Sequence, residues 1–227
     1  MVPDSISMEK VMIIVAGGKG KRMNSEVPKQ FHVVAGKPVL MHTIGRFSEY
    51  RDEIRILVVL PRPFIDFWNS LCKRYNFTIP HEVIEGGDSR FYSVKNGLEK
   101  VSDDQLVIIH DGVRPMPSNV TLHNVFKKAE KEGNAVPAIK INESMRKLIK
   151  EENTPVNRRE YRLIQTPQAF HGELIKKAYE QEYLDSFTDD ATVVEALGVK
   201  INLVEGNYEN IKITRPVDLK FAEAFLK

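Results

Sequence analysis

The chain has 227 residues, of which 42% are hydrophobic and 28% charged, a composition typical of soluble globular proteins. The formal net charge of +2 gives no overall attraction to nucleic acid or to membranes, so we expect neither as a partner. No stretch is long and apolar enough to span a bilayer, and the length predicts a single domain over residues 1–227.

The first ten residues, MVPDSISMEK, lack the apolar core of a secretion signal. The single cysteine, Cys72, excludes an internal disulfide and is typical of a protein kept in a reducing cytosol. These features predict a cytoplasmic location. The six histidines show no spacing typical of a zinc site, so no metal held by protein ligands alone is predicted.

Short apolar runs alternate with amphipathic stretches along the chain. Strands are predicted at 11–16, 54–60, 81–85, 105–110, 134–139 and 200–205. Helices are predicted at 39–47, 64–75, 89–101, 119–133 and 173–181. Most of the predicted strands are too apolar to have a solvated face, as in a parallel sheet covered on both sides. The alternation predicts a three-layer α/β fold with a mostly parallel, mixed sheet.

Two further segments have recognisable patterns. A last helix begins near Pro216, and one of its faces is apolar, consisting of Val217, Phe221, Ala222, Phe225 and Leu226. Residues 141–165 are highly charged and predict an extended hairpin with a polar turn near Glu151 to Pro155. This hairpin is interpreted either as a plain surface insertion or as an arm that crosses to a second subunit.

A glycine-rich loop, AGGKGKRM, follows the first predicted strand and is followed by PKQF. Glycines let a backbone approach a phosphate and point its N–H groups at it. The spacing fits neither G-x-G-x-x-G nor G-x-x-x-x-G-K-[ST], which excludes the dinucleotide fingerprint and the ATPase P-loop. The four cations Lys19, Lys21, Arg22 and Lys29 favour phosphate binding over a glycine turn with solvated lysines.

Polar residues follow other predicted strands in the same way. Asp111 stands where a strand passes into a loop, a position at which a carboxylate often meets a ribose hydroxyl or a metal. Lys212 lies in an otherwise apolar NIKIT segment, read as a short strand, where a salt bridge and an anion are the alternative partners. Asp88 and Ser89 are equally explained as helix caps. The segment FTDDA at 187–191 starts a helix, and its Asp189 and Asp190 are equally explained as acids in the first helical turn.

Eight motifs in order resemble the 2-C-methyl-D-erythritol 4-phosphate cytidylyltransferases of the non-mevalonate isoprenoid pathway. They run from about Lys10 to Leu226 and are AGGKGKRM, PKQF, GKPVLMHT, GGDSRFYSVKNGL, HDGVRP, QTPQAF, FTDDATVVEALG and VEGNYENIKITRPVDL. The resemblance implies a glycosyltransferase-like nucleotidyltransferase fold with a projecting β-arm that makes a homodimer. It also implies CTP, magnesium held mainly by the CTP phosphates, and attack by a polyol phosphate on the α-phosphate, giving a CDP-alcohol and pyrophosphate.

The resemblance also assigns roles to residues. The family's catalytic residues match Arg22 and Lys29, which stabilise the transition state, and Arg158 and Lys212, which position the phosphate nucleophile. Its nucleotide-binding residues match Ala16, Gly17, Gly18, Gly20, Gly87, Asp88, Ser93 and Asp111. Its substrate-binding residues match Arg114, Ser144, Thr166 and Thr188. Because the nucleophile is already an anion, positioning and positive charge are what such a reaction needs, and no general base is required.

The chain departs from the family pattern at a few positions. Gly112 and Val113 stand where two alanines are common, and Asn157 replaces an aspartate often seen before the catalytic arginine. Near the arm, Ser144 and Arg146 keep a hydroxyl and a cation in a changed motif. The alternatives are therefore a ribitol 5-phosphate cytidylyltransferase, which would differ in the polyol pocket, and a nucleotide-binding module without turnover.

Overall fold

The computed structural model describes residues 8–18, 27–50 and 53–226. Its main strands are β1 (Lys10–Val15), β4 (Arg55–Leu60), β5 (Glu82–Glu85), β6 (Leu106–Asp111), β7 (Asn134–Lys140), β10 (Arg162–Ile164), β11 (Gln168–His171) and β12 (Leu203–Glu205). Its helices are α1 (Val39–Tyr50), α2 (Ile65–Arg74), α3 (Arg90–Leu98), α4 (Asn119–Glu132), α5 (Gly172–Ala178), α6 (Asp190–Glu195) and α7 (Pro216–Leu226). Short 3₁₀ turns lie at Lys29–Phe31, Arg62–Phe64 and Arg158–Glu160.

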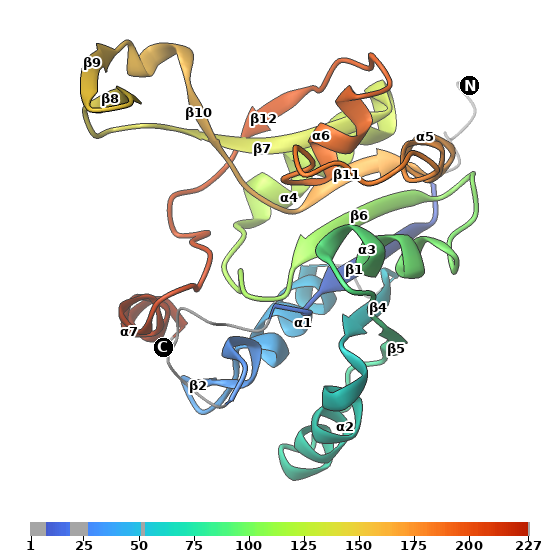
Figure 1. The fold of residues 1–227 in the computed structure, drawn as a ribbon. Helices are drawn as coiled ribbons and strands as arrows, with labels where there is room; N and C mark the ends of the chain where they lie inside the picture. The colour runs from blue at the N-terminus through green and yellow to red at the C-terminus, as the bar shows by residue number, and fades with distance from the viewer. Residues whose placement is uncertain (1–7, 19–26, 51–52, 227) are drawn as a thin grey trace, which may run out of the picture.

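Within the described residues, the main sheet has eight strands in the order β10-β7-β11-β6-β1-β4-β5, with β12 paired to β7. The pairs of β1 with β4 and β6, and of β4 with β5, are parallel. Strand β11 runs antiparallel between β6 and β7, so the sheet is mixed. The expected α/β fold with a largely parallel, mixed sheet is therefore confirmed (Figure 1).

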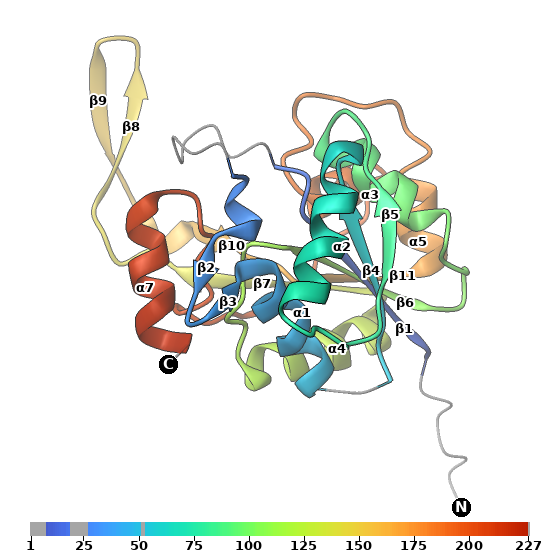
Figure 2. The ribbon, with the colours of Figure 1, turned by 90° about the horizontal axis from the view of Figure 1, so that it is seen from below.

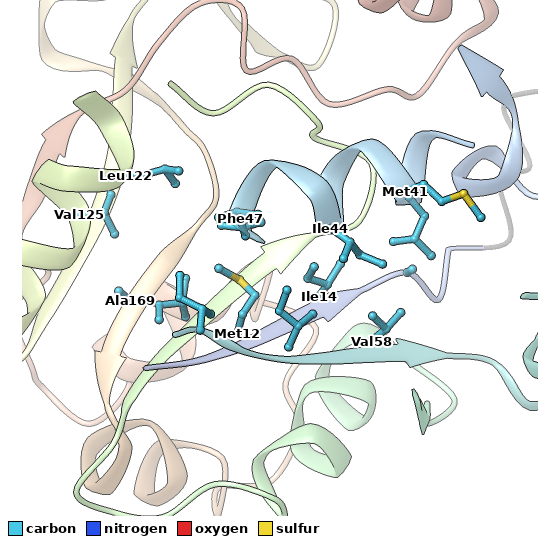
Figure 3. Packing of buried hydrophobic residues seen from close by; sticks show 14 of the residues in the cluster. Met12, Ile14, Met41, Ile44, Phe47, Val58, Leu122, Val125 and Ala169 are labelled. Carbon is cyan, nitrogen blue, oxygen red and sulfur yellow. The ribbon is translucent and has the colours of Figure 1, made fainter. Parts of the chain in front are cut away.

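Both faces of the sheet are covered by helices because alternate residues of the strands are apolar on each side. Met12 and Ile14 of β1 face one cluster, which contains residues of α1 and α4 (Figure 3) and also of α2. Val11 and Ile13 face the other, which contains residues of α3, α5 and α6. All four of these side chains are fully buried, which gives the three layers expected from the sequence.

Three expectations about secondary structure are wrong in detail. Strand β11, within the motif QTPQAF, was not predicted, because its apolar run is only two residues long and pairing with β6 and β7 makes it a strand. The strand predicted at 200–205 begins at Leu203. Residues 210–214 form no strand; they are irregular, and the N–H of Ile213 donates to the carbonyl of Val113.

The charged segment forms a hairpin of β8 (Met145–Ile149) and β9 (Glu152–Val156) that projects from the sheet (Figures 1 and 2). Its turn is at Lys150 and Glu151, and Lys150 has a φ of 54°, as a tight two-residue hairpin turn requires. The expected turn near Glu151 to Pro155 is therefore placed too late, since Pro155 pairs with Arg146 inside the hairpin.

The last helix is present, but its apolar face is divided. Ala222 is fully buried against a small cluster with Val34 and Ile213. Val217, Phe221 and Phe225 are about half exposed, at 48%, 54% and 58%. The division arises because α7 lies beside the small β2–β3 hairpin (Val33–Val34 and Lys37–Pro38) rather than on the main sheet. Among the described residues, no helix is long and apolar enough to cross a membrane.

Two helical glycines allow the packing to be tested. A Cβ atom added at Gly45 in α1 would lie 3.8 Å from Ile79, whereas one at Gly97 in α3 would lie 2.9 Å from Ile13. Gly45→Ala should raise the free energy of unfolding by about 0.5–1 kcal/mol through helix propensity. Gly97→Ala should lower it by about 1–3 kcal/mol, because α3 must move away from β1. Urea unfolding measures both, and changes of the same sign would contradict this account.

Candidate functional site

The site lies where the parallel strands β1 and β6 end side by side. Val15 and Asp111 are paired residues of these two strands, so the glycine loop after Val15 leaves the sheet next to the Asp111 carboxylate. The carboxyl ends of strands are where open α/β sheets bind ligands. The parallel pairing of β1 with β6 therefore brings the glycine loop beside the motif HDGVRP, almost a hundred residues later in the chain.

Two adjoining cavities open at this edge. The smaller, of about 370 Å³, is lined by predicted residues Ala16, Gly17, Gly18, Lys29, Gly87, Asp88, Ser93, Asp111 and Lys212. The larger, of about 500 Å³, is lined by predicted residues Arg114, Thr166 and Thr188. Arg90, Asp111 and Lys212 line both cavities and therefore mark their junction. The described residues that the family resemblance matches to nucleotide binding thus share one cavity, and three of the four that it matches to substrate binding share the other.

Four of the predicted site residues need separate mention. Gly20 and Arg22, with the loop cations Lys19 and Lys21, lie outside the described residues. Ser144 and Arg158 are exposed at the base of the β8–β9 hairpin and line neither cavity. The Arg158 guanidinium instead donates to the Asn142 carbonyl. A single chain therefore does not bring these two arm residues to the cavities.

Close packing explains Gly86 and Gly87, which precede α3 beside the smaller cavity. A Cβ atom at Gly87 would collide with Tyr92, and one at Gly86 would lie 2.9 Å from the Ser93 hydroxyl oxygen. Ser89 caps α3 by accepting from the N–H of Tyr92 at 3.4 Å, so its predicted capping role is correct. The segment 85–89 is thereby held against the start of α3, where Ser93 and Asp88 line the cavity.

The Asp111 carboxylate is surrounded by cations at the junction. Its Oδ2 lies 2.9 Å from Lys212 Nζ and 3.3 Å from Arg114 Nε, and its Oδ1 lies 3.6 Å from Arg90 Nε. Burial would raise the pKa of Asp111, but the charges of Arg90, Lys212 and Arg114 outweigh burial and hold the pKa far below its ordinary value. Asp111 is therefore ionised, and it holds Lys212 at the boundary of the two cavities.

Arg90 and Asp190 form an ion pair that sequence reasoning missed. Arg90 Nη1 and Nη2 lie 2.8 and 2.6 Å from the two carboxylate oxygens of Asp190, and Tyr179 donates its hydroxyl to Asp190 Oδ1 at 2.6 Å. Asp190 is fully buried, so it is more than the first-turn acid that its position suggested. The position of Arg90 directly after the glycines of GGDSR could have indicated a role in the site. No local sequence pattern predicts its contact with Asp190, which is 100 residues away in the chain.

Two more polar residues of the larger cavity were also missed. Gln168 donates to Asp189 Oδ2 at 2.8 Å and accepts from the N–H of Ala191 at 2.9 Å. Asp189 caps α6 by accepting from the N–H of Thr192 at 3.0 Å, whereas the sequence indicated only an acid in the first turn of a helix. These bonds fix the loop that carries Thr188. Gln168 lies in the motif QTPQAF, which could have indicated its role, but only Thr166 of this motif was assigned one.

The described residues contain no group of three His, Cys, Asp or Glu side chains that could hold a metal ion. Mg²⁺ in nucleotide sites is commonly held by one or two carboxylates together with substrate phosphates. Asp111 supplies such a carboxylate at the junction, and Asp88 lines the smaller cavity. The donor set therefore fits an ion held mainly by a triphosphate.

Comparisons with known proteins identify the family of this chain. The family model of 2-C-methyl-D-erythritol 4-phosphate cytidylyltransferase matches residues 10–227. The chain belongs to this family. A cytidylyltransferase of that name from Bacteroides thetaiotaomicron is 50% identical over 219 residues, covering 96% of this chain and 100% of the relative.

Solved structures of cytidylyltransferases lead to the same family. The 4-diphosphocytidyl-2C-methyl-D-erythritol synthase from Anaerococcus prevotii has a TM-score of 0.80 at 29% identity, covering 97% of this chain and 99% of that one. The 2-C-methyl-D-erythritol 4-phosphate cytidylyltransferase from Thermus thermophilus has a TM-score of 0.74 at 32% identity, covering 96% and 98%. The chain is thus a nucleotidyltransferase by family and by fold.

The histidine beside Asp111 gives a pH prediction for this cytidylyltransferase family member. Burial lowers the pKa of His110 to about 4, more than its hydrogen bond to the Arg114 carbonyl raises it. Above about pH 6.5 this histidine is neutral in both the folded and the unfolded chain and adds no pH dependence. Between pH 6.5 and 4 the unfolded chain binds a proton that the folded chain does not, so the free energy of unfolding decreases as the pH falls. The free energy of unfolding should fall by up to about 3 kcal/mol over this range.

Urea unfolding of the wild type and of His110→Gln between pH 4 and 7 tests this expectation. The variant should be less stable at pH 7, yet its stability should depend less on pH than that of the wild type. His42, whose pKa burial also lowers, remains in both proteins and contributes equally to both curves. Parallel curves for the two proteins would show that His110 is not the titrating group.

Proposed function

We propose that this protein transfers a cytidylyl group from CTP to 2-C-methyl-D-erythritol 4-phosphate, releasing pyrophosphate. The observation that carries the proposal is the position of Lys212 and Asp111 at the junction of a glycine-lined cavity and a polar cavity, with Lys29 on the glycine side. A nucleotide in the smaller cavity and a polyol phosphate in the larger would meet at that junction. Family membership supports the identity of both substrates.

The reaction joins two anions, so the chain must reduce their repulsion. A phosphate oxygen of the polyol phosphate attacks the α-phosphorus of CTP, and the bond to the β-phosphate oxygen breaks, so that pyrophosphate leaves. The Lys212 side chain is 40% exposed, so it is accessible to an incoming phosphate. Lys29 packs against Gly18 and faces the nucleotide side, where we assign it and Arg22 to the developing charge.

Magnesium would lie with the triphosphate near Asp111, where it would neutralise charge on the phosphate oxygens. The chain's own residues then hold the reactants. Gly17, Gly18 and Ser93 line the nucleotide side, and Arg114, Thr166 and Thr188 the polyol side. We expect the reaction to take place in the cytosol, since the only cysteine, Cys72, is a free thiol.

We further propose that the enzyme is a homodimer in which the β8–β9 arm serves the partner's site. Ser144 and Arg158, matched by the family to substrate and catalytic residues, lie at the base of this arm and away from the cavities of their own chain. Leu148 and Ile149 near its tip are 77% and 51% exposed, apolar surface that a second copy would cover. The site is then complete only in the dimer.

Pyrophosphate release tests the activity and separates the candidate substrates. With CTP and Mg²⁺, methylerythritol phosphate should be turned over with a kcat/KM at least about tenfold above that for ribitol 5-phosphate, since each well-placed polar contact is worth about a factor of ten. Preference for ribitol phosphate would identify the other polyol enzyme. Tight CTP binding without pyrophosphate release from either would identify a module without turnover.

Mixed dimers test the shared site. Lys29→Ala and Arg158→Ala should each lower kcat by about 100-fold or more in their homodimers. The first removes a charge that stabilises the transition state, and the second removes the cation that positions the phosphate nucleophile. In an equimolar, randomly exchanged mixture, half of the dimers are mixed and each has one complete site, so activity should recover to about a quarter of wild type. Lys128→Ala, which breaks an ion pair on α4 with Glu132 at 2.8 Å, is the matched control. Activity that stays at the level of the homodimers would place Arg158 in its own chain's site.

A further inference from the structure

Thr166 is held between two groups from β6 while it lines the larger cavity. Its Oγ1 accepts from the N–H of Asp111 at 3.0 Å and lies 3.0 Å from His110 Nδ1. The residue is only 4% exposed, and its own carbonyl accepts from Asn210 Nδ2 at 2.8 Å. The hydroxyl is thus fixed in position, and what it offers a ligand depends on where its proton points.

The direction of the bond between Thr166 and His110 follows from the other ring nitrogen. His110 Nε2 lies 2.8 Å from the Arg114 carbonyl oxygen, which can only accept, so Nε2 carries a proton. The ring is fully buried and a charged imidazolium there would lose its hydration, so the imidazole is neutral. Nδ1 is therefore without a proton and accepts one from the Thr166 hydroxyl.

The ring also has little freedom to turn and reverse this assignment. The imidazole and the ring of Phe47 in α1 pack edge to face, with ring centroids 4.7 Å apart and an angle of 73° between the ring planes. The carbonyl that it contacts belongs to a tight turn, in which the N–H of Arg114 donates to the Asp111 carbonyl at 3.0 Å. Helix α1, strand β6 and this turn together hold His110 in one orientation.

A threonine hydroxyl has one proton and two lone pairs. Here the proton is donated to His110 and one lone pair accepts from Asp111, which leaves a single lone pair. We propose that His110 acts as a positioning residue that makes Thr166 a hydrogen-bond acceptor only, so that the polyol side selects a ligand hydroxyl that donates there. The identity of the ligand as a polyol phosphate rests on the proposed function, whereas the direction of the bond does not.

Substrate analogues test the selection. In analogues of methylerythritol phosphate, each free hydroxyl in turn is replaced by fluorine, which keeps the size but cannot donate. For the hydroxyl that faces Thr166, wild-type kcat/KM should fall by about 10- to 100-fold, because fluorine would meet the remaining lone pair. Equal acceptance of every fluorinated analogue would contradict the proposal.

Two variants of His110 separate positioning from a loss of stability. His110→Asn keeps an acceptor near the Nδ1 position and should preserve the discrimination against fluorine. His110→Gln keeps a donor for the Arg114 carbonyl but removes that acceptor, which frees the Thr166 proton to turn toward fluorine. The discrimination should then decrease by about tenfold. His42→Gln, at a buried histidine whose Nε2 lies 2.6 Å from the Val34 carbonyl oxygen, is the control and should keep the wild-type ratio. An unchanged ratio in His110→Gln would overturn the proposal.

Nitrogen NMR of the wild-type protein tests the bond without any substrate. At pH 7, His110 should give the signals of a neutral ring with its proton on Nε2. A proton on Nδ1, or a charged ring, would overturn the proposal even if the enzyme is active. Absence of cytidylyl transfer in the wild type would instead contradict the proposed function and leave this spectrum to decide the direction of the bond.

Discussion

The arrangement of the site depends on one carboxylate, Asp111, held at the end of a buried strand by three cations. A carboxylate in this place would be unfavourable alone, because burial disfavours its charged form. Arg90, Arg114 and Lys212 come from three separate segments and converge on it. The same contacts that satisfy Asp111 therefore set the positions of the cations that a phosphate would meet.

Much of this arrangement could be predicted from the sequence because local patterns determine it. The buried strands, most helices and the capping role of Ser89 follow from apolar runs and from polar residues at helix starts. The glycine loop and Asp111 could be placed together because the carboxyl ends of parallel strands share one edge. What the sequence predicted best were features that depend on a few neighbouring residues.

Features that depend on distant partners were missed for a physical reason. Asp190 resembles any acid in a first helical turn until α3 and α6 pack and bring Arg90 to its carboxylate. Strand β11 has too short an apolar run to be recognised, and becomes a strand by pairing with β6 and β7. The apolar stripe of α7 predicted a buried face, yet Phe221 and Phe225 are about half exposed in this chain, because α7 lies beside a small hairpin.

The ion pair of Arg90 and Asp190 joins the two halves of the site. Arg90 begins α3, just after the glycines of the nucleotide side, and Asp190 begins α6, just after Thr188 of the polyol side. A bidentate pair to a fully buried carboxylate permits little relative movement, and removal of Arg90 would leave the buried charge of Asp190 without its cation at a cost of about 3–5 kcal/mol. The two cavities are therefore held in a fixed position relative to each other before any ligand binds.

The charges at the junction do not cancel. Arg90, Arg114 and Lys212 face the carboxylates of Asp111 and Asp190, so this cluster of described residues retains a net positive charge. Arg90 and Arg114 are the less exposed cations, at 28% and 12%, and their hydrogen bonds to protein groups hold them in place. Lys212, at 40%, is a flexible point charge that can turn from Asp111 to a phosphate without leaving that carboxylate unpaired, because the two arginines remain. The fixed arginines thus allow one lysine to move, and an anion entering either cavity would meet that lysine.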